Sequence, residues 1–203
     1  NAGLGGSSAA SAALLGAFAA WRGEGWDHRA IAEEGRRIEV EELGIAGGRQ
    51  DHYAATHGGA LALTFSDRVD VRRVAMSART RAEFERRSIL LYTGESRISG
   101  SNITEVLRAY ASREARVIIA LARMRALAEE IGSALEGGDL DTVGALMGKH
   151  WEHQRSLHPA IPTPLIDEIV RRAAGAGALG SKAMGASGGG CVLVIAAADA
   201  VER

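Results

Sequence analysis

Residues 3–9, Gly3-Leu4-Gly5-Gly6-Ser7-Ser8-Ala9, form a glycine-rich loop that runs directly into a stretch rich in Ala, Leu and Phe. This composition predicts a helix over residues 7–21, with Ser7 or Ser8 as its cap. Glycines let backbone N–H groups approach a phosphate closely, and the positive end of the following helix faces such an anion. No Gly-Lys-Ser/Thr follows, so this is not a Walker A loop. Taken alone, the loop fits a phosphate site and a simple helix cap equally well.

A second feature is a pair of carboxylates, Glu39 and Asp51. An aspartate can orient or deprotonate a hydroxyl that accepts a phosphoryl group, and a glutamate at a helix end can supply a hard oxygen ligand for Mg²⁺. Glu39 lies in a predicted helix that Asp27 caps and that runs to about Leu43. Residues 44–59 are predicted to be a Gly-rich connection. A single Glu–Asp pair usually lies on a solvated surface, so this pair has meaning only together with other motifs.

A second glycine-rich segment, residues 182–190, reads Lys-Ala-Met-Gly-Ala-Ser-Gly-Gly-Gly and enters an apolar strand at residues 191–197. Because such a loop carries few side chains, a phosphate or another backbone segment can approach it closely. The alternative is a tight hairpin connection. Three consecutive glycines lose much conformational entropy on folding, which favours a functional loop.

The overall composition excludes several classes of protein. The 203 residues fit one large domain or two small ones, and the formal net charge of -1 shows no basic excess for nucleic acid or a membrane surface. The single cysteine, Cys191, cannot form an internal disulfide, and no signal peptide or membrane-spanning run is visible. We therefore expect a cytoplasmic protein with neither a nucleic-acid nor a membrane partner.

The order of the predicted elements is that of an α+β protein. Residues 60–65, 69–76 and 89–92 are predicted strands, and residues 77–85 a linker. Helical periodicity continues over residues 104–135, as one long helix or two in series. Further helices are predicted to begin at Asp139 and at Thr163-Pro164, and Asp199 is predicted to open a last one.

In this order the three segments resemble the motifs of the GHMP kinases, the family of galacto-, homoserine, mevalonate and phosphomevalonate kinases. Residues 3–9 are similar to the family's second motif, Gly-Leu-x-x-Ser-Ser, and residues 185–190 to its third, Gly-Ala-Gly-Gly-Gly-Gly. Residues 47–55 resemble Gly-Gly-Lys-Gln-Asp-Gln-Tyr-Ala of a sugar-kinase branch that holds D-glycero-D-manno-heptose 7-phosphate kinase and fucokinase-like enzymes. Residues 92–97 and 150–157 are similar to two further segments of this branch.

The resemblance implies a role for each motif residue. Asp51 stands at the position of the catalytic aspartate, and Glu39 and Ser7 at those of the Mg²⁺ ligands. The residues implied to hold ATP are Gly3, Leu4, Gly5, Gly6, Ser7, Ser8, Gly185, Gly188 and Gly189. The implied reaction is ATP-dependent phosphorylation of a sugar or sugar phosphate, at the anomeric hydroxyl of a heptose 7-phosphate or, as the nearest rival, on a free hexose such as fucose.

The resemblance also implies an α+β GHMP kinase fold in two parts. Residues 1–78 would be the remainder of a ribosomal-S5-like N-terminal domain, and residues 79–203 a ferredoxin-like C-terminal domain. The family's first motif is absent, and the chain begins at Asn1 inside the first loop. We therefore expect the missing N-terminal segment to come from a partner chain or to have been trimmed.

Two residues depart from the family pattern, and two other interpretations stay open. Ser187 replaces a glycine of the third motif and is expected to tighten that loop, whereas His52 replaces a common glutamine and is expected to affect substrate choice. A non-catalytic ligand-binding or sensor protein of the same fold would also fit. An NAD-binding oxidoreductase could use Gly3-x-Gly5, but it would leave the second glycine-rich loop unexplained.

Overall fold

The computed structural model describes residues 2–95 and 100–202, and within them the chain forms two compact units. The small unit comprises Leu4–Arg73. The large unit comprises the chain from Val74 onward together with the first three residues. Asn1, Ser96 and Arg97, which the sequence singled out, lie outside the described residues. The predicted assignment of two domains, 1–78 and 79–203, stays a prediction.

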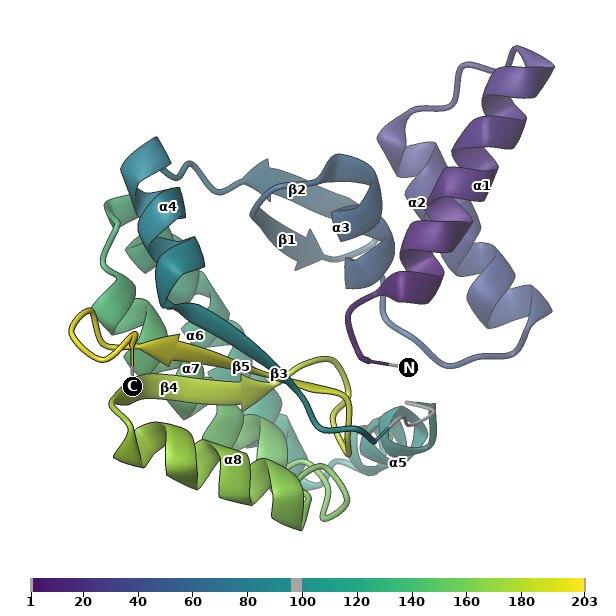
Figure 1. Ribbon diagram of the computed structural model, residues 1–203. Helices are drawn as coiled ribbons and strands as arrows, with labels where there is room; N and C mark the ends of the chain where they lie inside the picture. Colours follow the sequence, from purple (N-terminus) through teal and green to yellow (C-terminus); the bar gives the residue numbers. More distant parts are fainter. Residues whose placement is uncertain (1, 96–99, 203) are drawn as a thin grey trace. The chain divides into compact units, whose positions relative to one another are not determined.

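The small unit consists of three helices, one π-helical turn and a two-stranded hairpin (Figure 1). In chain order these elements are α1 (Gly6–Arg22), α2 (His28–Arg37), η1 (Ile38–Glu42), α3 (Gln50–His57), β1 (Leu61–Phe65) and β2 (Val69–Arg73). The strands pair antiparallel, with Leu61 opposite Arg73. A small core of Ala32, Tyr53 and Val69 joins α2, α3 and the hairpin.

The large unit places helices against a three-stranded antiparallel sheet of order β3-β5-β4 (Figure 1). Its elements are α4 (Ala78–Arg87), β3 (Ser88–Tyr92), α5 (Gly100–Ala111), α6 (Ala115–Gly137), α7 (Leu140–Arg155), α8 (Pro164–Gly175), β4 (Ala178–Ala183) and β5 (Cys191–Ala196). The core gathers Val117 from α6, Trp151 from α7, Ile166 from α8 and Val192 from β5. Burial of these apolar surfaces is what holds the helices on the sheet.

Most of the predicted elements are confirmed, including the α+β class. Asp27, Asp139 and Thr163 each accept a hydrogen bond from a backbone N–H of the helix that they cap. The periodic stretch 104–135 is two helices, α5 and α6. The predicted serine cap of α1 is wrong: the N-cap is Gly5, in the left-handed conformation and without a side-chain cap.

Three further predictions about local structure are wrong, and one strand was missed. Residues 44–59 contain α3, and the predicted linker 77–85 overlaps α4, whose N-terminus forms because Ser77 Oγ accepts the Thr80 N–H at 3.0 Å. Residues 198–202 form turns instead of a helix at Asp199, and β4 was not predicted. Among the described residues, no helix is both long enough and apolar enough to cross a bilayer.

Candidate active site

The first glycine-rich loop meets Asp51 within the small unit. Gly5 has a φ of 69°, and a Cβ added there would lie 3.3 Å from Asp51 Cβ and 3.7 Å from its Oδ1. Asp51 is exposed and lies in the first turn of α3. The absence of a side chain at Gly5 therefore lets an exposed carboxylate stand against the N-terminus of α1, where backbone N–H groups have no helical partner.

The two serines that follow face different surroundings. Ser7 is exposed in the first turn of α1, whereas Ser8 is 3 % exposed. A hydroxyl that ligates a cation must be reachable, and this favours Ser7 over Ser8 as the ligand. Leu4 and Gly6 are also exposed, so the loop is open to a ligand along most of its length.

Glu39 lies in the π-helical turn η1, directly after α2. Its Oε2 is 3.2 Å from Nε2 of His52, and its side chain is 23 % exposed. A Cβ at Gly47 would lie 3.8 Å from the same oxygen, so the 47–48 backbone passes close by. His52 follows Asp51 on α3. One predicted carboxylate, Asp51, therefore lies on α3, and the other, Glu39, contacts the next residue of that helix.

The donor chemistry of Glu39 and Ser7 fits Mg²⁺. Magnesium is usually held by one or two protein oxygens together with phosphate oxygens and waters, not by a closed protein cage. No group of three or more His, Cys, Asp or Glu side chains in the described part of the chain could hold a metal by itself. The roles of Glu39 and Ser7 stay predictions.

In the large unit, the second glycine-rich loop contacts the very start of the chain. The Cys191 N–H donates to the Ala2 carbonyl oxygen at 3.0 Å, and a Cβ at Gly190 would lie 2.8 Å from that oxygen. A Cβ at Gly3 would lie 3.3 Å from the Met184 carbonyl oxygen. The start of the first glycine-rich motif is therefore fastened to the second, which lies far away in the sequence.

Two further motif segments hold the same loop. The Thr93 N–H and hydroxyl both donate to the Gly190 carbonyl oxygen, at 2.9 and 2.8 Å, and the Gly190 N–H donates to the Glu95 carbonyl. On α7, Gln154 Nε2 donates to the Gly185 carbonyl oxygen at 3.0 Å. The segments at 92–95 and 150–157, which the sequence singled out, thus converge on the 185–190 loop.

Ser187 fits the loop despite its side chain. Its φ of 61° is one that glycine adopts easily and serine rarely does. Its hydroxyl donates to the Ile161 carbonyl oxygen at 2.8 Å, and the Gly188 N–H reaches the same oxygen at 3.0 Å. The serine therefore ties the loop to the segment before α8, in agreement with the expected tightening.

Several buried polar groups were not anticipated from the sequence. The His52 ring is 2 % exposed and faces Glu39, so the expectation that its side chain affects substrate choice is not supported by its position. Burial lowers the pKa of Lys182 to about 8, and burial together with the nearby Lys182 lowers the pKa of His150 to about 4. The sequence did not indicate the burial of Lys182, because its strand, β4, was not predicted.

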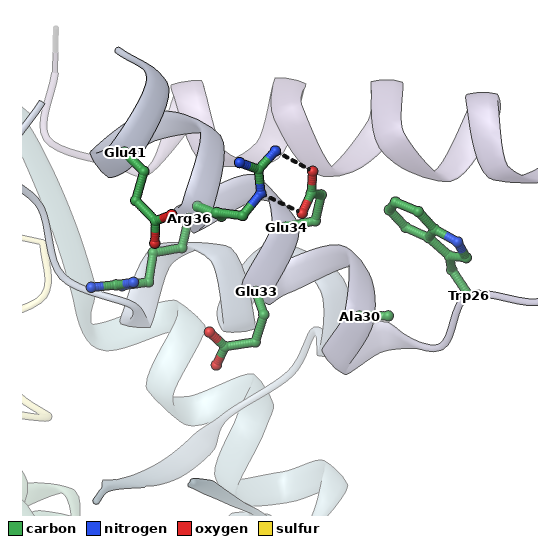
Figure 2. Close-up of a pocket in the computed structure, with 7 residues that line it drawn as sticks. Trp26, Ala30, Glu33, Glu34, Arg36 and Glu41 are labelled. Atoms are coloured by element: carbon green, nitrogen blue, oxygen red, sulfur yellow. Dashed lines mark hydrogen bonds and ion pairs between the residues drawn. The ribbon is translucent and has the colours of Figure 1, made fainter. Parts of the chain in front are cut away.

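An open pocket of about 410 Å³ lies along α2 and η1 (Figure 2). Trp26 and Ala30 stand at one end, and Glu33, Glu34, Arg36, Arg37 and Glu41 form the rest of its lining. Figure 2 shows the paired hydrogen bonds of Arg37 with Glu34, at 2.9 Å each. None of the predicted site residues lines this pocket.

Comparison with known proteins extends over nearly the whole chain. The model "GHMP kinases N terminal domain" matches residues 1–59, and "GHMP kinases C terminal" matches residues 119–203. A D-glycero-alpha-D-manno-heptose 7-phosphate kinase of Campylobacter jejuni is 31 % identical over 192 residues, covering 94 % of this chain and 56 % of that protein. An L-fucokinase/L-fucose-1-P guanylyltransferase of Bacteroides fragilis is 28 % identical, over 97 % of this chain and 21 % of that protein.

A solved structure agrees. A D-glycero-D-manno-heptose 1-phosphate kinase from Bacteroides thetaiotaomicron superposes with a TM-score of 0.72 at 26 % identity, covering 96 % of this chain and 53 % of that one. The chain therefore spans little more than half the length of the heptose phosphate kinases that it matches.

Proposed function

Because the chain belongs to the GHMP kinase family, we propose that the whole protein transfers the γ-phosphate of ATP to a hydroxyl of a sugar or sugar phosphate. The two family models match both ends of the chain, and the relatives that align along it are named as sugar kinases. The observation that carries the proposal is the contact of Asp51 with Gly5, which puts an exposed carboxylate at the loop expected to hold phosphate.

The proposed mechanism assigns each group a task. Asp51 orients the acceptor hydroxyl and accepts its proton as the phosphoryl group is transferred. Gly3, Gly5, Gly6 and the 185–189 loop are each proposed to bind ATP phosphate through the backbone, and the dipole of α1 favours negative charge at its N-terminus.

Glu39 and Ser7 would hold Mg²⁺, which neutralises phosphate charge when bound. Phosphoryl transfer passes through a loose transition state, so a site of this kind acts mainly by positioning and electrostatic stabilisation. The protein's own contribution is therefore the placement of Asp51, Glu39 and the two loops.

For the substrate, we propose the anomeric hydroxyl of a heptose 7-phosphate. The motif at 47–55 and the aligned Campylobacter jejuni relative support this choice. A free hexose such as fucose is the nearest alternative, since the Bacteroides fragilis relative is named as an L-fucokinase. A partner chain for the N-terminal segment and a cytoplasmic location stay predictions.

The test is ATP consumption by the full-length protein against a panel of sugars and sugar 7-phosphates, with and without Mg²⁺. We expect Mg²⁺-dependent turnover on one of them and a loss of about 10²–10⁴-fold in kcat for Asp51→Asn, with nearly unchanged ATP binding. Asp70→Asn, an exposed aspartate on β2, is the matched control and should retain full activity.

Two results would count against the proposal. Full activity of Asp51→Asn would remove the aspartate's role. No turnover on any sugar, with ATP or sugar binding still measurable, would favour a non-catalytic binding protein of this fold.

A further inference from the structure

A largely buried polar contact in the small unit joins His52 to Glu39. The His52 side chain is 2 % exposed, and its Nε2 lies 3.2 Å from Glu39 Oε2. Because an ionised carboxylate can only accept, a hydrogen bond across this contact requires the hydrogen to be on Nε2. Within residues 2–95 and 100–202, no side chain forms a hydrogen bond or ion pair with the other carboxylate oxygen of Glu39.

The surrounding helices make room for this histidine. A Cβ at Gly35 on α2 would lie 2.9 Å from His52 Cδ2 and 3.1 Å from the Ser11 hydroxyl oxygen of α1. A side chain at Gly35 would therefore push the ring away from its place. The three helices α1, α2 and α3 contact one another here, and their packing fixes the direction in which Nε2 points.

The second ring nitrogen argues against a purely structural role. His52 Nδ1 is buried, and no described residue forms a hydrogen bond with it. Burying an unsatisfied polar atom is unfavourable, and each such atom in a folded protein calls for an explanation. Tyr53, the next residue, shows the contrast: its hydroxyl donates to Glu33 at 2.6 Å. An apolar residue would fill the His52 position without this penalty, so the benefit must lie in what Nε2 does.

The backbone on the other side of the contact is also unusual. Glu39 belongs to a π-helical turn of five residues that continues α2. Such turns are rare in proteins, and those that occur are often at functional sites, because the extra residue redirects the side chains that follow it. Here the Leu43 N–H bonds to the Ile38 carbonyl oxygen across the wider turn. The turn and the histidine together determine where the Glu39 carboxylate points.

We propose that His52 is a positioning residue that holds one oxygen of Glu39 so that the other is presented to a divalent cation. This deepens the proposed function and rests on it in one respect, the role of Glu39 as a cation ligand. A residue that bonds to a metal-ligating side chain orients that side chain and reduces the conformational entropy that it loses when the metal binds. His52 itself touches neither cation nor substrate.

The test measures cation binding without turnover. Mn²⁺ is titrated into the full-length protein in the presence of a non-hydrolysable ATP analogue and followed by electron paramagnetic resonance. We expect His52→Leu to weaken Mn²⁺ binding by about 10–100-fold, the usual effect of removing such a partner. His52→Gln, whose amide N–H₂ can donate at similar reach, should restore most of the affinity.

The control variant is His57→Ala, on the same helix. The His57 ring stacks on Tyr53 and packs against His28 instead of facing Glu39, so its removal should leave Mn²⁺ affinity unchanged. If thermal melts show that His52→Leu does not fold, His52→Asn takes its place. The asparagine amide is too short to reach Glu39, so the His52→Asn protein should bind Mn²⁺ as weakly as expected for His52→Leu.

The outcomes separate the two proposals. Unchanged Mn²⁺ affinity in folded His52→Leu or His52→Asn overturns the positioning role, even if the protein is an active kinase. Weakened affinity that His52→Gln restores supports it, even if no sugar is turned over. Absence of nucleotide-dependent Mn²⁺ binding by the unchanged protein overturns the cation site and the positioning role together.

Discussion

The contact between Gly5 and Asp51 can be tested by adding a single methyl group. In Gly5→Ala the new Cβ would lie 3.3 Å from Asp51 Cβ and 3.4 Å from its Cγ, closer than most such contacts in proteins. Asp51 must therefore move by a few tenths of an ångström. Because a misplacement of about 1 Å can reduce a rate by about 10²-fold, we expect kcat to fall by about tenfold.

The same substitution also strains the backbone, and this effect has a matched control. Gly5 has a φ of 69° at the start of α1, and Gly23 has a φ of 72° at its end. An alanine in the left-handed region costs about 1–2 kcal/mol at either position. Nothing lies within 4 Å of a Cβ at Gly23, so Gly23→Ala has the strain without the displacement.

The two variants are compared in the full-length protein by urea unfolding and by steady-state kinetics on the sugar that the panel identifies. We expect similar losses of unfolding free energy, with a fall in kcat for Gly5→Ala alone. Equal kcat values for the two variants would refute the reasoning, because the contact with Asp51 would then have no catalytic consequence.

Three further predictions concern the large unit. A Cβ at Gly180 would lie 1.9 Å from the Gly144 carbonyl oxygen, so Gly180→Ala should lose more than about 3 kcal/mol in urea unfolding or fail to fold. Ser187→Ala and Ser187→Gly both lose the hydrogen bond to Ile161, but only alanine is strained at this φ, so Ser187→Ala should be less stable than Ser187→Gly by about 1–2 kcal/mol. Burial lowers the pKa of Lys182 to about 8, so its positive charge destabilises the folded state below pH 8, and this penalty fades as the pH rises toward 10.5. In urea unfolding, Lys182→Met should therefore be more stable by about 1–3 kcal/mol at pH 7 and little changed near pH 10.5.

Each of these has a result that would contradict it. Gly132→Ala, in α6 with nothing within 4 Å of its Cβ, is the control for Gly180 and should be neutral or stabilising by about 1 kcal/mol. Equal stability of the two Gly→Ala variants would argue against close packing of β4 on α7. Equal melting of the two Ser187 variants would mean that the left-handed φ at this position costs a side chain nothing. A Lys182→Met gain that is independent of pH would mean that the ammonium is not the cause.

The sequence allowed prediction wherever a local side chain determines local structure. Asp27 and Thr163 predict the start of their helices because a capping side chain bonds to a backbone N–H only three residues away. The ordered motifs also led to Asp51 and Glu39. In the structure, Asp51 lies on α3 and Glu39 contacts His52, the next residue of that helix. These signals are short-range, or depend on a fixed order along the chain.

The elements that escaped prediction form through contacts between distant segments. The short helix α3 is held by the buried ring of Tyr53, whose hydroxyl bonds to Glu33 on α2. The strand β4, Ala-Leu-Gly-Ser-Lys-Ala, has little strand propensity, and it forms by pairing with β5 while Gly180 lets the α7 backbone come close. The burial of His52 follows from three helices at once, so no single stretch of sequence could indicate it.

The bond from Cys191 to Ala2 has a consequence for how the protein is made. Ala2, at the start of the first glycine-rich motif, is translated long before Cys191, to which it is hydrogen-bonded. Closing so long a loop is slow, and ribosomes add about 5–20 residues per second. We therefore expect the nascent protein to lack nucleotide affinity until β5 has left the ribosome, so that an interrupted chain cannot sequester ATP.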